Sequence, residues 1–169
     1  MLKLIGEVPR VISKDRVVAP SIQTAADYSV RFKLTLTGTS PRVSNILRIA
    51  AVPPGTKQYG ARVLGVWLLP SSTKLQVVLD NLERYNPILD ARYECKCPDA
   101  SRPLRADQEH DVRIEVRGAA ARCYIDGDLE CETPVERRGA GPGSVAVYAS
   151  DPFSEPAPGI LRELEYEAL

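Results

Sequence analysis

The strongest constraint on this chain is a two-residue alternation of apolar and polar side chains. In residues 29–37 polar residues stand between four apolar ones, which are Val30, Phe32, Leu34 and Leu36. Successive side chains of a strand point to opposite faces of a sheet, so this run predicts a strand with one buried and one solvated face. Residues 111–117 and 74–80 repeat the pattern.

Other runs extend the set of expected strands. Residues 62–69, RVLGVWLL, are apolar at almost every position, which predicts a central strand covered on both faces with Trp67 in the core. Three further runs, 44–52, 87–93 and 144–150, complete the set, and turns rich in glycine, proline and serine separate them. Many short strands at this spacing predict an all-β sandwich or barrel.

Composition excludes several classes of function. A chain of 169 residues suits one domain, residues 1–169, and its 22 basic and 22 acidic residues cancel. We therefore expect no nucleic-acid partner, and the arginines of residues 102–122 have acidic neighbours typical of a mixed-charge solvated face. No apolar run reaches the ~20 residues of a transmembrane helix. The start has no signal-peptide pattern, so we expect an intracellular protein, or an extracellular one if a leader was omitted.

The four cysteines leave three arrangements open. Cys95 and Cys97 lie too close along one strand for an easy bridge. Cys123 and Cys131 flank the hairpin turn at Asp126-Gly127; a three-residue turn would place them opposite each other, and a two-residue turn would offset them by one register step. Reduced structural thiols are the first expectation, a Cys123–Cys131 disulfide the second, and a metal site, whose usual spacing is missing, the third.

Three stretches, in chain order, resemble the concanavalin A-like lectin/glucanase superfamily, especially its laminin G-like modules. They are SNILRIAA with residues 60–80, the hairpin EHDVRIEVRGAAARCYIDGDLE, and the closing segment 144–169. The resemblance implies a jelly-roll sandwich of two antiparallel sheets whose terminal segments pair. It also makes 160–168 a strand, although LRELEYEAL fits a helical stripe equally well. His110 stands where the family usually has Trp and is interpreted as a packing or edge residue.

The carboxylates do not predict catalysis. Some relatives hydrolyse glycans with a Glu-x-Asp-x-Glu strand, which Glu163, Glu165 and Glu167 imitate. However, the central acid is Glu and the resemblance places this strand at the chain end, so we interpret the three as an exposed face. Asp126 belongs to the hairpin turn. We expect no enzyme activity, and a glycoside hydrolase is the third-ranked function.

Binding is the first-ranked function. Relatives bind glycans or proteins through a loop rim or sheet face, sometimes with calcium. In this chain the loop candidates for ligand binding are Gln58, Tyr59, Tyr85 and Asn86. Asp151 is a candidate calcium ligand, or else caps a turn before Pro152. The sequence thus predicts a lectin-like module that recognises a glycan or a protein, with a structural subunit of a larger assembly as the alternative.

Overall fold

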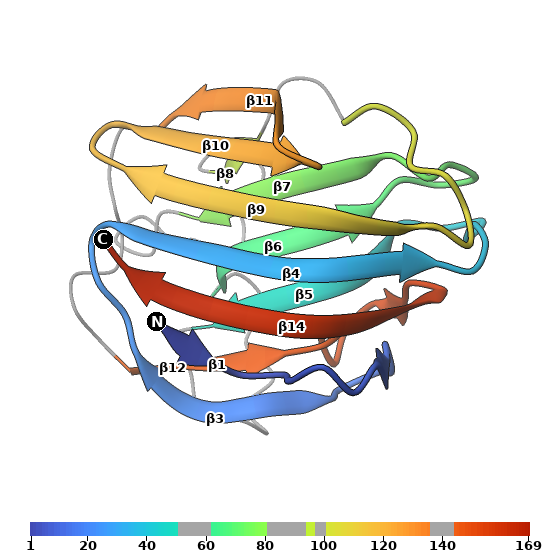
Figure 1. The fold of residues 1–169 in the computed structure, drawn as a ribbon, viewed down its shortest axis with the longest axis horizontal. Helices are drawn as coiled ribbons and strands as arrows, with labels where there is room; N and C mark the ends of the chain where they lie inside the picture. Colours follow the sequence, from blue (N-terminus) through green and yellow to red (C-terminus); the bar gives the residue numbers. More distant parts are fainter. Residues whose placement is uncertain (51–61, 81–93, 97–100, 136–143) are drawn as a thin grey trace.

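The computed structural model describes residues 1–50, 62–80, 94–96, 101–135 and 144–169, with residues 62, 80 and 94–96 described through their backbone. It contains two antiparallel sheets, which overlap face to face (Figure 1). In the described part of the chain there is no helix, and hence none long and apolar enough to cross a membrane. The predicted all-β, two-sheet antiparallel sandwich is confirmed.

Sheet A is the front layer in Figure 1. Its strands in spatial order are β1 (Leu2–Lys3), β14 (Gly159–Ala168), β4 (Tyr28–Leu36), β9 (Glu109–Arg117), β10 (Ala120–Ile125) and β11 (Asp128–Pro134), and β2 (Arg10–Val11) also pairs with β14. The N-terminal β1 and β2 both pair with the C-terminal strand, as the resemblance implied.

Sheet B lies behind sheet A. Its strands in spatial order are β3 (Val17–Gln23), β12 (Ser144–Tyr148), β5 (Ser44–Ala50), β6 (Arg62–Leu68), β7 (Leu75–Asp80) and β8 (Glu94–Lys96), and β13 (Glu155–Pro156) pairs with β5 in parallel. Chain neighbours β4 and β5 lie in different sheets, and β9 returns to sheet A beside β4. This alternation between layers makes the sandwich a jelly roll.

The alternating residues form the core between the sheets. Phe32 and Leu34 of β4 are fully buried and belong to one cluster with Ile114 of β9 and with Leu64 and Val66 of β6. Each buried Leu, Ile or Phe side chain contributes about 1.5–3 kcal/mol to stability when it leaves water. The apolar residues of the alternating pattern thus pack against each other on the inner faces of the two sheets.

Strand β14 resolves the ambiguity between helix and strand at the C-terminus. It pairs with β4, and its register shifts between Arg162 and Glu165. Glu163 has a φ of 51°, and its N–H donates to the carbonyl of Gly6. This β-bulge inserts one residue, so that Leu161 and Leu164, three apart, both point into the core. The spacing that suggested a helix is the spacing of a bulged strand.

The hairpin of β10 and β11 combines the two turns considered from sequence. Ile125 pairs with Asp128 across a two-residue turn, and a register shift beyond Tyr124 brings Cys123 opposite Cys131. Nevertheless, Cys123 is a free buried thiol, while Cys131 is disulfide-bonded and therefore has another partner. The predicted Cys123–Cys131 disulfide is wrong, because Cys131 is bonded to another cysteine, although both side chains pack at the core of the sandwich. Cys97 lies outside the described residues.

Trp67 is buried, but not between the sheets. Its neighbours Val66 and Leu68 belong to the main core, so Trp67 points from β6 toward the opposite, outer face of sheet B. Tyr148 and Ala146 of β12 form a small apolar cluster on that face with Ala50 of β5. The expected burial of Trp67 in a strand covered on both faces is confirmed, and its side chain lies on the outer face of sheet B.

Candidate functional site

The four loop residues proposed as ligand contacts, Gln58, Tyr59, Tyr85 and Asn86, lie outside the described residues. The strands that flank their segments are described. Ala50 pairs with Arg62, and Asp80 pairs with Glu94. Both segments therefore leave sheet B at the same end.

Asp151 is fully buried, and its carboxylate is used by the protein's own donors. Its Oδ1 accepts hydrogen bonds from the backbone N–H groups of Phe153 at 3.0 Å and Ser154 at 2.7 Å. Its Oδ2 lies 3.6 Å from Nη1 of the equally buried Arg48. Asp151 thus caps the turn around Pro152, which was the alternative to a calcium ligand. Among the described residues, no three His, Cys, Asp or Glu side chains are arranged to hold a metal ion.

Arg48 continues this buried group. Its guanidinium carbon lies 4.9 Å from the ring centroid of Phe153, so a cation–π contact adds to the ion pair. Asn45 of the same strand accepts a hydrogen bond from the Asp151 N–H at 2.9 Å. Removing Arg48 and Asp151 from water is costly, and their mutual contact offsets that cost. The group fixes the 149–155 segment onto β5.

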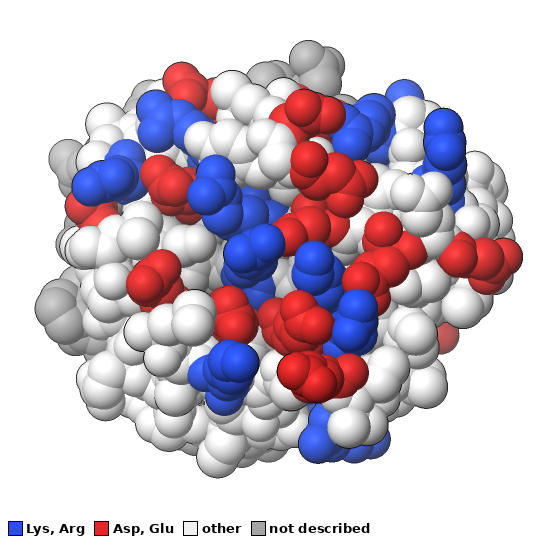
Figure 2. Space-filling view, in the orientation of Figure 1, with Lys and Arg blue, Asp and Glu red and all other residues white. Residues whose placement is uncertain are grey.

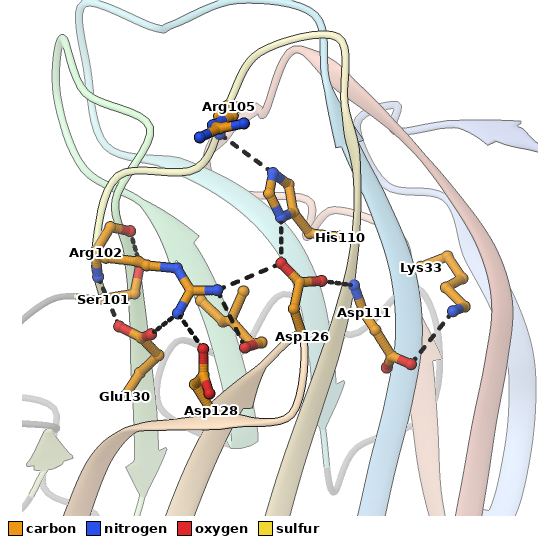
Figure 3. A network of polar contacts seen from close by, with 10 residues as sticks. Lys33, Ser101, Arg102, Arg105, His110, Asp111, Asp126, Asp128 and Glu130 are labelled. Carbon is orange, nitrogen blue, oxygen red and sulfur yellow. Dashed lines mark hydrogen bonds and ion pairs between the residues drawn. The ribbon is translucent and has the colours of Figure 1, made fainter.

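A second polar network lies at the turn of the β10–β11 hairpin (Figure 3). The Asp126 carboxylate accepts from the N–H of Asp111 at 2.9 Å and contacts Nδ1 of His110 at 2.7 Å. Asp126 itself has a φ of 54°, which short polar side chains tolerate best after glycine. The hydrogen bonds hold this conformation, so Asp126 serves the turn.

The surroundings of His110 define its hydrogen-bonding role. The ring is buried, and its Nε2 accepts from the backbone N–H of Arg105 at 3.2 Å. Nε2 is therefore the unprotonated nitrogen, and Nδ1 carries the proton that it donates to Asp126. Both ring nitrogens are used within the protein. His110 is a packing residue, as its interpretation from sequence stated.

Arg102 connects this hairpin to sheet B. Its Nη1 lies 2.6 Å from Glu130 and 3.1 Å from Asp128, and its Nη2 lies 3.4 Å from Asp126. The preceding Ser101 donates its N–H to the carbonyl of Leu75 in β7. Burial acts to raise the pKa of Asp126, but the hydrogen bonds from His110 and Asp111 and the charge of Arg102 hold that pKa below its ordinary value. The polar groups of this hairpin therefore serve the structure, as the assignment of Asp126 to the turn predicted.

The outer face of sheet A carries charges of both signs (Figure 2). Arg31 and Lys33 of β4 both bind the Asp111 carboxylate, and Arg162 binds Glu109. The contacts of Arg31 and Lys33 join the neighbouring strands β4 and β9, and the contact of Arg162 reaches from β14 across β4 to β9, so opposite charges face each other across the sheet. The expected mixed-charge face of the arginine-rich segment is present, with Arg122 bound to Glu132.

The strand register arranges these polar side chains in cross-strand rows. One row runs Glu167, Ser29, Glu115, Arg122 and Glu132, and the next runs Glu165, Arg31, Arg113, Tyr124 and Leu129. Ser29, between Glu167 and Glu115 in the first row, is much smaller than these two neighbours. A hollow of about 170 Å³ lies over it. We call it the Ser29 hollow; its lining is Ser29, Arg31, Arg113, Glu115, Glu165 and Glu167, together with Met1 and Leu169.

The Ser29 hollow contains hydrogen-bonding groups that the protein itself does not use. Glu115, Glu165 and Glu167 make no hydrogen bond or ion pair with any described residue. Arg113 stacks its guanidinium over the Tyr124 ring at 4.3 Å, which leaves the N–H groups at its edge directed away from the ring. The hollow thus offers free acceptors and free donors on rigid strands.

A second hollow lies at the loop rim. It measures about 440 Å³, and its lining is Thr39, Ser40, Pro41, Arg42, Glu155, Pro156 and Pro158. Prolines give it few hydrogen-bonding groups, and the Ser40 hydroxyl already accepts from the N–H of Arg42. The Ser29 hollow is therefore the better equipped of the two for a polar ligand.

The sequence singled out Glu165 and Glu167 because they imitate a catalytic strand. It did not predict the other residues that line the Ser29 hollow. Ser29, Arg31, Arg113 and Glu115 occupy the polar positions of alternating runs, which the sequence identifies as outward-facing. Their meeting depends on the register between β14, β4 and β9, which alternation alone does not specify. Glu163 does not join them, because the bulge removes it from the row and Arg162 binds it at 3.1 Å.

Comparison with known proteins finds similarity in structure alone. No protein-family model matches the sequence, and no curated protein matches it. The carbohydrate-binding module CBM66 from Bacillus subtilis is 9% identical, with a TM-score of 0.50 over 87% of this chain and 78% of that one. The heptameric SAP-like pentraxin from Limulus polyphemus is 14% identical, with a TM-score of 0.55 over 99% of this chain and 76% of that one.

Sheep galectin-11, solved in complex with glycerol, is 13% identical, with a TM-score of 0.52 over 96% of this chain and 98% of that one. All three neighbours are lectin-like jelly-roll sandwiches. At such identities the likeness shows the fold. It confirms the jelly-roll architecture that the resemblance to the concanavalin A-like superfamily implied.

Proposed function

We propose that residues 1–169 act as one lectin-like module that binds a glycan, and that the Ser29 hollow is the binding site. The observation that carries the proposal is the set of unused donors and acceptors in this hollow, held on three adjacent strands of a lectin-like sandwich. Sugar hydroxyls both donate and accept hydrogen bonds, so they match such a lining. Strand-borne side chains are already in place, which lowers the entropic cost of binding.

A hydrolytic function has less support. The carboxylates that imitate a catalytic strand do not form a regular row, since Glu163 lies in the bulge of β14 and contacts Arg162. Glu165 is half-buried and Glu167 is exposed on the outer face of sheet A, so solvent reaches both carboxylates. Their geometry supports binding.

The test is glycan-array binding of the full chain, with one arm in calcium and one in EDTA. Ser29→Phe fills the hollow, and Thr35→Phe is the matched control, because Thr35 is an outward-facing residue of the same strand outside the hollow. We expect the wild type and Thr35→Phe to bind a glycan equally, and Ser29→Phe to lose at least tenfold in affinity. A silent array, or equal binding by both variants, would overturn the proposal.

A structural role in an assembly is the second candidate function, and one observation favours it. Four apolar side chains of the N-terminal segment are exposed: Leu2 at 45%, Val8 at 77%, Val11 at 66% and Val17 at 36%. They lie on or beside β1, β2 and β3, at the margin where both sheets end (Figure 1). If this margin mediates assembly, light scattering of the wild type shows an oligomer that Val8→Ser with Val11→Ser converts to a monomer.

A further inference from the structure

We infer that the Ser29 hollow selects a neutral sugar ring, held through neighbouring hydroxyl groups, and rejects sulfated and carboxylated glycans. The inference rests on the proposed function and specifies its ligand. The basis of the inference is that the protein already pairs some of the charged side chains of the lining and leaves others unpaired.

The positive charges of the lining are partly used. Arg31 donates from Nε to Oδ1 of Asp111 at 2.9 Å and to Oδ2 at 3.1 Å, and its Nη2 binds the same carboxylate. This two-point contact pairs the charge of Arg31 with Asp111 and leaves its Nη1 N–H groups unused by any described residue. Among the lining side chains Arg113 is the cation without an ion pair to a described residue, and its face is occupied by Tyr124. An anionic group would therefore find one cationic side chain of the lining that is not already paired with a described carboxylate.

The negatively charged side chains of the lining make no hydrogen bond or ion pair with any described residue. Glu115 faces the hollow from β9, and Glu165 and Glu167 face it from β14, on the other side of β4. Counted over its side chains, the lining has a net negative charge, because three carboxylates stand against the two guanidinium groups of Arg31 and Arg113. A sulfate or carboxylate would be placed among like charges, which costs free energy.

Neutral hydroxyl pairs satisfy the same lining. A carboxylate accepts two hydrogen bonds at its two oxygens, and the edge of a guanidinium donates two in parallel. Adjacent hydroxyls of a sugar ring can donate to Glu115 or Glu165 and accept from Arg113. The half-buried Ser29 hydroxyl at the base can do either. The side chains of β9 and β14, on the two sides of Ser29, thus match a ring that carries hydroxyls on both edges.

The experiment compares three sets of immobilised glycans on one array: neutral oligosaccharides, uronate-containing oligosaccharides, and sulfated oligosaccharides including heparin fragments. We expect the wild type to bind neutral glycans at least tenfold more strongly than either anionic set, with little change between 50 and 500 mM salt. Periodate oxidation, which cleaves adjacent diols, should abolish the binding of the neutral glycans.

A charge-reversal variant tests the cause. Glu115→Lys makes the lining net positive, so we expect a gain of at least tenfold in binding to sulfated glycans. Glu155→Lys, an exposed residue of β13 outside this hollow, is the control for net charge and should show no such gain.

The outcomes separate the two proposals. Binding of sulfated or uronate glycans that Ser29→Phe abolishes would overturn the neutral selectivity and leave the site standing. Binding of neutral glycans that survives periodate would overturn the role of adjacent hydroxyls. An array silent in all three sets would overturn the proposed function, and the selectivity with it.

Discussion

At the scale of single residues, two polar groups built around the buried His110 and the buried Asp151 stabilise turns. Asp126 and His110 hold the hairpin, and Asp151 with Arg48 holds the 149–155 segment on β5. In both groups a carboxylate accepts backbone N–H donors that a turn would otherwise leave unsatisfied. The Asp126 and Asp151 carboxylates are therefore used by the fold itself.

Replacing Asp151 with Ala should destabilise the protein strongly. It would leave Arg48 buried without its counter-ion and the N–H groups of Phe153 and Ser154 without an acceptor, for a loss of about 3–5 kcal/mol in the free energy of unfolding. Asp151→Asn keeps an acceptor for those N–H groups and should lose less. Urea denaturation measures both, and equal losses would show that the ion pair, rather than the turn cap, determines the cost.

At the scale of elements, the bulge of β14 is the feature that gives the C-terminal strand its pattern. Glu163 adopts a left-handed φ of 51°, which costs a non-glycine residue about 1–2 kcal/mol. The bulge nevertheless lets Leu161 and Leu164 share the core. The strain at one position is thus offset by the burial of two side chains.

Substitutions at Glu163 should follow its backbone conformation. Glu163→Gly should leave stability unchanged or raise it by up to about 1 kcal/mol, while Glu163→Val should lower it by about 1–2 kcal/mol. Glu165 lies two residues further in regular pairing with Arg31, so Gly should be worse than Val there. Chemical denaturation of the four variants checks whether Gly is more stable than Val at position 163 and less stable than Val at position 165. The same order of Gly and Val at both positions would argue against the bulge.

The charged rows of sheet A should make stability depend on acid pH. Hydrogen bonds from Arg31 hold the pKa of Asp111 below its ordinary value, and a hydrogen bond from Arg162 does the same for Glu109. A carboxyl with a lowered pKa in the folded state gives stability that is complete above the unfolded-state pKa and lost as pH falls through the folded-state pKa. The loss should therefore begin near pH 4, where unfolded Asp and Glu protonate, and continue below it.

Unfolding free energies measured from pH 7 to pH 2 check this dependence. Asp111→Asn should flatten the acid slope, while Glu155→Gln, at a residue with no ion pair in the described part of the chain, should leave it unchanged. An identical slope in wild type and Asp111→Asn would show that the row contributes nothing to the acid dependence.

How far the sequence predicts an element depends on whether the evidence is local. The alternation of Val30, Phe32 and Leu34 predicts β4 because strand geometry alone causes it. The bulge at Glu163 was not predicted, since i, i+3 spacing is shared by helices and bulged strands. The Ser29 hollow was not predicted either, because it exists only once β14, β4 and β9 pair in one register.

At the scale of the whole molecule, one core lies between the two sheets, and the charged side chains lie on the outer face of sheet A and at the turns. Cys123 belongs to that core, and burial raises the pKa of its thiol to about 12. The thiolate is the reactive form, so a buried neutral thiol is inert. Reactivity at Cys123 therefore reports on the opening of the sandwich.

We expect Cys123 to resist alkylation in the native protein and to react at a rate set by unfolding. Mass spectrometry of iodoacetamide-treated protein should find Cys123 modified only in denaturant, and non-reducing peptide maps should find Cys131 in a disulfide with a cysteine other than Cys123. Rapid native labelling of Cys123, or a Cys123–Cys131 cross-link, would contradict the packing described above.

The short segment that carries Ser101 and Arg102 is attached to both layers at once. Ser101 exchanges hydrogen bonds with Leu75 of sheet B, and Arg102 contacts three carboxylates of the hairpin in sheet A. Under a mechanical load that shears one sheet across the other, the contacts of Ser101 and of Arg102 would have to break together. The two sheets should consequently separate last at the corner beside β7 and β11.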